Sequence, residues 1–440
     1  MDIGAGIQET PESVSKASAL PDVVQQQATW VVARLGAYMH YAVPRILQHT
    51  GRLERFYTDF YAGTVATRLL SSIPKRWRGS EINRALGRCT PDLPPDRIWS
   101  YPLLGLEYYV RQARARGPEE RSEVFLLAGS KFGKLVTRDG FGNARAMYGF
   151  NTAALEMLRA AKQQGLVTTL EQTIAPRALE EQLLTEEHRR FPTWEPARVQ
   201  GHSTIKTIER ERAEWELADL IICGSEFVRQ GVAHCGGPVQ KCVVVPYGID
   251  ARFSLAVRPS HNGPLRVLSV GEAGLRKGIP YAAETARLLG ELAEFRWVGP
   301  VRLLPDARTY VEQFVHLTGG IPRNQIFSHF EWADVFFLPS VCEGSAIVTY
   351  EALISGLPVI ATPNTGSIVT DGVTGYIVPT RDTQAMVDKL RRLHLDRGLL
   401  SQMQKAALGN AKMASLEGFG DRLLRALSKG IARDNFTSKH

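Results

Sequence analysis

The second half of the chain shows the clearest pattern of apolar and polar positions, because short apolar runs alternate there with longer amphipathic segments. The apolar runs predict strands at 265–270, 295–298, 335–338 and 357–361. The segments between and after them predict helices at 281–293, 306–317, 347–355 and 382–393. Strands that alternate with helices indicate a parallel sheet whose two faces are covered.

The first half repeats this alternation less regularly. It begins with a predicted strand at 29–33, followed by Gly36 and a helix at 38–47 that Pro44 is expected to kink. Further apolar runs predict strands at 124–128, 166–170, 220–223 and 242–245. Helices are predicted at 148–164, at 177–190, at 204–217 and from Glu226 onward.

A polar segment at 253–264, broken by Pro259 and Pro264, is the best candidate for a linker. The length of 440 residues also favours two domains over one. We therefore expect an α/β protein with two Rossmann-like domains of doubly wound parallel sheet, at 28–255 and 256–425, facing a central cleft. Tails are expected at 1–27 and 426–440.

Composition and cysteine usage exclude several classes of protein. No run of eighteen apolar residues predicts a membrane-spanning helix, and the N-terminus lacks the pattern of a secretory signal. The five cysteines are scattered without a CxxC pair, so we expect reduced thiols in a cytoplasmic protein. No metal site is expected, because the spacing of His234, Cys235 and Cys242 fits no familiar ligand pattern.

The net charge of +8 is concentrated in a basic segment at 66–117, which is expected to be an irregular insertion. Between Arg68 and Arg116, ten lysine and arginine residues face four acidic ones. Large apolar residues are interleaved with these cations: Leu69, Leu70, Ile73, Trp77 and Trp99. This mixture suits peripheral contact of segment 68–116 with an anionic membrane, at the inner face of the cytoplasmic membrane. A solvated basic face is the alternative, and nucleic acid is not expected because no nucleic-acid motif accompanies the charge.

Candidate chemistry lies where the predicted strand at 335–338 ends. Glu343 follows that strand, a helix opens near Ser345, and Glu351 comes eight positions after Glu343. The free amides of the first helical turn would bind a phosphate, and a carboxylate just before them could accept hydrogen bonds from sugar hydroxyls. The alternative is that Glu343 only helps to cap the helix and that Glu351 is an ordinary exposed residue.

These residues belong to a longer pattern. Pro339-Ser340, then Glu343-Gly344, then Glu351 and the run ALISGLPVIA at 352–361 resemble the family 4 glycosyltransferases of the two-domain GT-B fold. The similarity extends to LSVG at 268–271 with LRKG at 275–278, and to VPYGID at 245–250. It is specific from about residue 218 to 379 and looser before that.

The resemblance implies transfer of a sugar from a UDP-, GDP- or ADP-sugar to a glycan or lipid-linked acceptor, with retention of anomeric configuration. It implies no permanently bound cofactor and no metal, and a place in bacterial surface polysaccharide assembly. The implied catalytic residues are Glu343, Lys277 and Arg276. Lys277 beside a glycine that opens a helix would hold a pyrophosphate, whereas the alternative is a solvent-facing Arg-Lys pair.

The remaining expected site residues divide between the two substrates. The donor-binding residues are expected to be Gly271, Gly344, Ser345, Ala346, Ile347 and Glu351, and the acceptor side is expected to include Gly36, His40 and Glu171. His40 has a surface or packing role as its alternative, and Glu171 a structural hydrogen-bonding role.

The chain also departs from the family pattern at four places, the first being Tyr247 in the run VPYGID, where the family has an asparagine. Glu272 stands where the family often has an arginine, so that Arg276 is the candidate to supply the missing charge. Glu171 stands where many relatives have a histidine, and Gly-Ser-Ala-Ile at 344–347 replaces the commoner Gly-Phe-Gly-Leu.

Three other classes of protein compete with a transferase. A non-catalytic scaffold of the same fold would be expected to lose Lys277, Glu343 or Glu351, and all three are present. A related epimerase stays open, whereas nothing in the sequence suggests the pyridoxal phosphate lysine of a phosphorylase. A nicotinamide dehydrogenase is disfavoured because no G-x-G-x-x-G follows a predicted strand.

Overall fold

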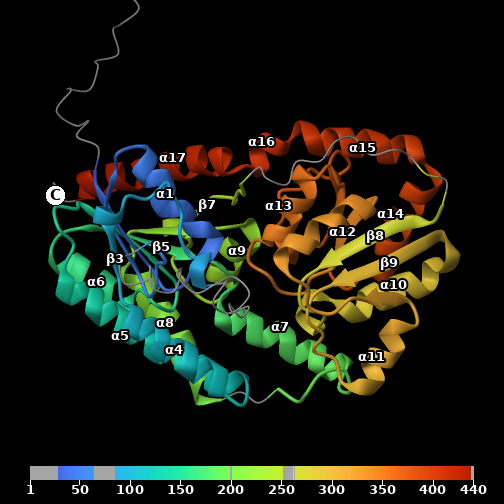
Figure 1. The fold of residues 1–440 in the computed structure, drawn as a ribbon, viewed down its shortest axis with the longest axis horizontal. Coiled ribbons are helices and arrows are strands. Elements are labelled where there is room, and N and C mark those ends of the chain that lie inside the picture. Colours follow the sequence, from blue (N-terminus) through green and yellow to red (C-terminus); the bar gives the residue numbers. More distant parts are fainter. Residues whose placement is uncertain (1–27, 64–84, 199–200, 251–260, 262, 438–440) are drawn as a thin grey trace, which may run out of the picture.

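Two parallel β-sheets lie side by side, each flanked by helices (Figure 1). The computed structural model describes residues 28–63, 85–198, 201–250, 261 and 263–437. The expected tail at 1–27, most of the expected linker, and residues 66–84 of the basic segment lie outside this range.

The first sheet has seven strands in the order β3-β2-β1-β4-β5-β6-β7. Its strands are β1 (Trp30–Arg34), β2 (Leu53–Thr58), β3 (Ile98–Ser100), β4 (Ala146–Phe150), β5 (Val167–Gln172), β6 (Leu220–Cys223) and β7 (Cys242–Val244). The helices of this domain are α1 (Ala42–His49), α4 (Pro102–Arg114), α5 (Pro118–Asp139), α6 (Leu155–Gln163), α7 (Arg177–Arg190), α8 (His202–Leu217) and α9 (Glu226–His234). Strands β1 and β6 are near-continuous apolar runs because helices cover both faces of the sheet.

The second sheet has six strands in the order β10-β9-β8-β11-β12-β13. Its strands are β8 (Leu265–Val270), β9 (Ala293–Val298), β10 (Val315–Leu317), β11 (Val335–Leu338), β12 (Val359–Ala361) and β13 (Gly375–Ile377). Its helices are α10 (Ile279–Leu289), α11 (Pro305–Glu312), α12 (Ile326–Trp332), α13 (Ile347–Ile354), α14 (Thr383–Leu395), α15 (Arg397–Gly409) and α16 (Ala411–Ala414). The strand order reverses at β1 in one sheet and at β8 in the other, so the loops after these strands open at the switch points where such sheets bind ligands.

The last helix, α17 (Leu416–Thr437), returns to the first domain. Figure 1 shows it in red across the top of that domain. Phe419, Leu423 and Leu427 share a buried core with Trp30 and Leu47 of the first domain. The predicted domain end at 425 therefore falls inside a helix, and residues 426–437 are not the tail that we predicted.

The structure corrects four predicted elements. The strand predicted at 124–128 lies within helix α5, where part of its run packs against α4, and the start of the helix predicted at 148–164 is strand β4. The helix predicted at 306–317 ends at Glu312, and Val315–Leu317 pair with β9 as an edge strand. The basic segment is not irregular throughout, because β3 and α4 form within it. Among the described residues, no helix combines the length and the apolar character that crossing a bilayer requires.

Candidate functional site

Glu343 lies in the loop after β11, between the two domains, and its carboxylate is held by two cations. Oε2 accepts a hydrogen bond from Arg276 Nη2 at 2.9 Å, and Oε1 is 2.8 Å from Lys277 Nζ. Burial of Glu343 would raise its pKa, but the charges of Lys277 and Arg276 outweigh burial and lower it. The three residues expected to be catalytic are therefore brought together, around an ionised carboxylate.

Arg276 and Lys277 come from one short turn, η8 (Leu275–Lys277), which follows β8 and leads into α10. Arg276 also donates to the carbonyl of Cys342 at 3.0 Å, and its own carbonyl accepts the amides of Val341 and Cys342. The turn is thus fastened to the Glu343 loop by backbone and side chain. The alternative of a solvent-facing Arg-Lys pair does not describe Lys277, whose side chain is only 15% exposed. The side chain of Arg276 is 37% exposed, but it too pairs with Glu343.

Gly271 makes room for Lys277. Its φ of +134° is in the region that favours glycine, and a Cβ at this position would lie 2.5 Å from Lys277 Cε. Glu272, which stands where the family often has an arginine, pairs with Arg302 at 2.9 Å. The second cation on Glu343 is Arg276.

The start of α13 is partly engaged in the protein's own hydrogen bonds. The Ser345 hydroxyl bonds to Tyr350 Oη at 2.7 Å and to the Gly366 carbonyl at 3.0 Å, and the Ala346 amide donates to Thr365 at 3.1 Å. Ser345 and Ala346 therefore shape this turn. Of the expected donor-binding residues here, Ile347 is the one whose amide opens the helix, where a phosphate is favoured.

Glu351 lies on α13 about two turns after the Glu343 loop and is 1% exposed, so the alternative of an ordinary exposed residue is wrong. Its Oε1 pairs with Arg323 from η10 (Arg323–Gln325), while Oε2 is buried with no hydrogen-bond partner among the described residues. Burial raises the pKa of Glu351, and the charge of Arg323 opposes that rise. A buried carboxylate oxygen without a donor suits a ligand hydroxyl.

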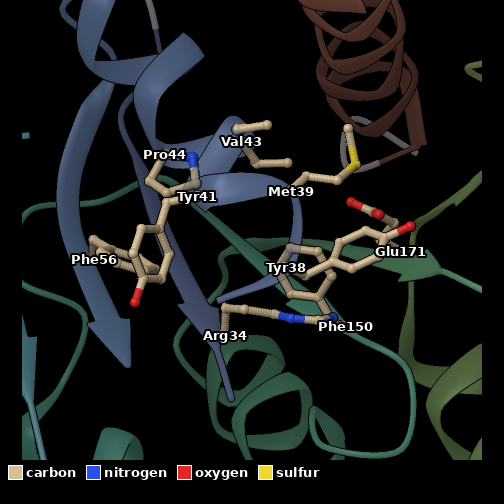
Figure 2. Close-up of a pocket in the computed structure, with 10 residues that line it drawn as sticks. Arg34, Tyr38, Met39, Tyr41, Val43, Pro44, Phe56, Phe150 and Glu171 are labelled. Atoms are coloured by element: carbon tan, nitrogen blue, oxygen red, sulfur yellow. The ribbon is translucent and has the colours of Figure 1, made fainter. Parts of the chain in front are cut away.

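On the first domain, Glu171 is the next-to-last residue of strand β5 and is only 1% exposed. Its carboxylate accepts hydrogen bonds from Tyr148 Oη at 2.6 Å and Tyr247 Oη at 2.9 Å. Burial raises its pKa, opposed by the Tyr148 hydrogen bond and by the charge of Arg34. Figure 2 shows Glu171 and Arg34 on either side of Tyr38, at a cavity of about 10 Å³, the order of space that one water needs.

A chain of hydrogen bonds connects Glu171 of the first domain to Ser345, at the start of α13. Tyr247 donates its hydroxyl to Glu171, and its amide donates to Tyr350 Oη at 3.1 Å. Tyr350 in turn meets the Ser345 hydroxyl at 2.7 Å. The alternative that Glu171 has a structural hydrogen-bonding role is therefore supported by its contacts. Sequence reasoning missed this network because Tyr247 replaces the asparagine of the family's turn without any local sign of its partner.

The other acceptor-side candidates lie in the loop after β1. Gly36 has a φ of +88° and donates its amide to Asp59 Oδ1 at 2.8 Å, and Asp59 pairs with Arg88 at 2.5 Å. His40 is exposed on the turn η2 (Tyr38–Tyr41), with a φ of +52°. Three consecutive non-glycine residues, Met39 to Tyr41, are left-handed there, a strain of about 1–3 kcal/mol each. Asp59 and Arg88 were not anticipated, since no motif surrounds them.

The cysteines and the candidate metal ligands were also compared with the predictions, within the part of the chain that the structure describes. All five cysteines are free thiols. Among the residues described, no group of three or more histidine, cysteine, aspartate or glutamate side chains is arranged to hold a metal ion.

Comparison with known sequences supports the resemblance over part of the chain. A family model described as Glycosyl transferases group 1 matches residues 264–396. The amylovoran biosynthesis glycosyltransferase AmsK of Erwinia amylovora is 32% identical over 192 residues, which are 40% of this chain and 47% of that protein. The putative colanic acid biosynthesis glycosyltransferase WcaL of Escherichia coli is 31% identical over 43% of this chain and 51% of its own length. The chain thus spans about half the length of the curated relatives it matches.

Comparison with solved structures covers nearly the whole chain and establishes the fold. HepE of Anabaena, solved in complex with UDP, matches with a TM-score of 0.56 and 14% identity, over 91% of this chain and 100% of that one. Sucrose-phosphate synthase of Thermosynechococcus elongatus matches with a TM-score of 0.57 and 14% identity, over 92% of this chain and 100% of that one. The chain therefore has the GT-B fold, with two Rossmann-like domains, as predicted.

Proposed function

We propose that this protein is a glycosyltransferase that moves a sugar from a nucleotide-sugar donor to a glycan or lipid-linked acceptor. The observation that carries the proposal is the convergence of Arg276 and Lys277 on the buried Glu343, beside the start of α13. The local similarity to Glycosyl transferases group 1 includes all three residues. The similarity to AmsK and WcaL supports a role in bacterial surface polysaccharide assembly.

In the proposed reaction, negative charge grows on the departing nucleoside diphosphate as the bond to the sugar breaks. Arg276, Lys277 and the amide of Ile347 would stabilise that charge by being fixed in place beforehand. These groups offer the neutralisation that the reaction needs without a metal. The donor base is the least constrained part, and UDP, GDP and ADP all stay candidates.

The two glutamates would bind different parts of the donor. Glu343, next to the cations, would accept hydrogen bonds from the sugar hydroxyls, and the free oxygen of Glu351 would accept one from the ribose. Each carboxylate is held by its own cations, and Glu351 lies about two helical turns away. A pair of carboxylates flanking one anomeric carbon at about 5 Å is therefore not the proposed mechanism. We propose transfer with retention of configuration, on the strength of the family resemblance.

The acceptor is proposed to enter beside Gly36 and His40, on a protein that works at the inner face of the cytoplasmic membrane. Helix α4, in the basic segment, supports the membrane contact. It exposes Leu103 by 84%, Leu106 by 59% and Tyr109 by 50%, at three-residue spacing and next to Arg111 and Arg114. Apolar side chains beside arginines suit an anionic lipid surface.

Thermal unfolding with added nucleotides tests donor binding. One of UDP, GDP or ADP at millimolar concentration should raise the melting temperature of the wild type, because a ligand that binds only the folded state stabilises it. The shift should be lost in Lys277→Ala and kept in Lys412→Ala, whose side chain is 75% exposed. If no nucleotide or nucleotide sugar shifts the wild type, a scaffold without a donor site becomes the better account.

A further inference from the structure

One segment that belongs to the first domain by sequence is docked on the second. It runs from α7 through residue 198, and we call it the strap, 177–198. At its start, the amide of Arg177 donates to Glu211 of α8 at 2.8 Å. Near the end of α7, Glu187 accepts hydrogen bonds from Tyr281 at 2.9 Å and from Arg381 at 2.6 Å, both in the second domain. Figure 1 shows α7 below the space between the two sheets.

Aromatic packing fixes the far end of the strap. Phe191 meets Tyr281 edge-to-face with ring centres 5.6 Å apart, and Trp194 meets Tyr310 at 5.9 Å. The carbonyl of Trp194 accepts the amide of Leu304 at 2.8 Å. These contacts hold the next residue, Glu195, at a defined place on the second domain.

That place is the start of the turn that carries Arg276 and Lys277. Glu195 Oε1 accepts the amide of Leu275 at 2.6 Å, and Leu275 is the first residue of η8. The residue before it, Gly274, has no side chain with which to cap the turn. A carboxylate 80 residues earlier in the chain thus fills the role that a capping side chain normally fills locally.

The absence of a side chain at Gly274 leaves room for the Glu195 carboxylate to cap the turn. A Cβ at residue 274 would lie 2.4 Å from Glu195 Oε1, so a larger residue there would push the carboxylate away from its present position at the amide of Leu275. The backbone of Gly274, with φ of −165°, is extended and open to any residue, so the close approach is what demands glycine here.

We infer that Glu195 is a positioning residue, which holds the Arg276–Lys277 turn in the place where it meets the donor diphosphate. This inference rests on the proposed function, because it assigns those two cations to the diphosphate. It also explains why an acidic residue stands close to a site that should attract anions. Electrostatics alone would make Glu195 unfavourable for diphosphate binding, whereas positioning makes it favourable, so the two effects differ in sign.

Calorimetric titration of the full chain tests the inference, with whichever of UDP, GDP and ADP binds the wild type most tightly and with its monophosphate. Glu195→Ala should weaken diphosphate binding about tenfold, and Glu195→Gln by less than about threefold, because the amide oxygen still accepts the Leu275 hydrogen bond. The preference for diphosphate over monophosphate should fall in the alanine variant. Glu312→Ala, which removes an exposed acidic residue of the second domain, should change neither affinity.

A double-mutant cycle gives an independent readout. Gly274→Ala should weaken diphosphate binding about as much as Glu195→Ala, and adding it to Glu195→Ala should cost less than about twofold more. Unchanged or tighter binding in Glu195→Ala, equal effects of alanine and glutamine, or additive effects of the two sites would each overturn the inference. A loss of affinity that is equal for diphosphate and monophosphate, with a lower melting temperature, would show a structural role instead. If the wild type binds none of the three diphosphates, the proposed function fails first.

Discussion

Replacing Glu343 by glutamine should move diphosphate affinity and transfer rate in opposite directions. In the structure the carboxylate lies 2.9 Å from Arg276 and 2.8 Å from Lys277, and it competes with a diphosphate for both. Glutamine keeps the shape and one acceptor oxygen but removes the charge. The two cations would then be more available to a bound diphosphate, while the contact with the donor sugar would be weakened.

The magnitudes follow from the kind of contact. A hydrogen bond to a charged group is worth about 1.5–3 kcal/mol, so the unliganded variant should lose roughly that much stability for each weakened contact. If the loss of the Glu343 charge makes the interaction of the two cations with the diphosphate about 1.4 kcal/mol more favourable, the diphosphate should bind about tenfold more tightly. Weakening the contact between residue 343 and the donor sugar in the transition state should slow transfer by about 100-fold.

Two measurements on the same protein preparation decide the matter. Titration calorimetry gives the Kd for the diphosphate, and steady-state release of diphosphate from the matching sugar donor gives kcat. A Glu343→Gln variant with weaker diphosphate binding, or with undiminished kcat, would refute the placement of Glu343 between the cations and the sugar. Glu312→Gln serves as the matched control, because Glu312 is an exposed glutamate that also pairs with an arginine.

The remaining predictions concern the cations, the acid dependence of stability and the membrane. Lys277→Ala should lower kcat/KM for the donor by about 100-fold or more, measured against Lys412→Ala, and an effect below threefold would contradict its role. The pKa of Glu343 is lowered by folding, so its contribution to the free energy of unfolding should be complete above its unfolded pKa of about 4.3 and lost as pH falls through the lower folded value. Urea unfolding should therefore show a smaller difference in the free energy of unfolding between wild type and Glu343→Gln at pH 4 than at pH 7. An equal difference at the two pH values would contradict this. The double variant Leu103→Glu, Leu106→Glu should lose co-sedimentation with anionic phosphatidylglycerol vesicles while keeping donor turnover in solution; binding equal to that of wild type would count against the α4 surface.

Much of the second domain could be predicted from the sequence because its signals are local. Strands β8 and β11 have the predicted bounds, since each is a short apolar run between turn residues. Glu343 and Lys277 were proposed for the same reason, as each lies in the connection between such a strand and a helix. Their contact across the loop follows from parallel strands ending at one edge of a sheet.

What the sequence did not reveal depends on partners far away in the chain. The run at 124–128 has the composition of a strand, but it lies within helix α5, which packs against α4, α6 and α8. Helix α17 shares the core of the first domain although it follows the second, and no local pattern says so. Glu195 is 80 residues from the amide that it holds. Spacing along the chain carries no trace of such contacts.

The most direct test of the central claim is turnover of a sugar donor. Purified protein would be given UDP-, GDP- and ADP-sugars with a lipid extract of bacterial envelopes, and release of nucleoside diphosphate would be followed together with transfer of label to the extract. The account predicts release and transfer with one donor, reduced about 100-fold in Lys277→Ala and in Glu343→Ala. Absence of turnover with every donor, from a protein that is folded and binds a diphosphate, would contradict it.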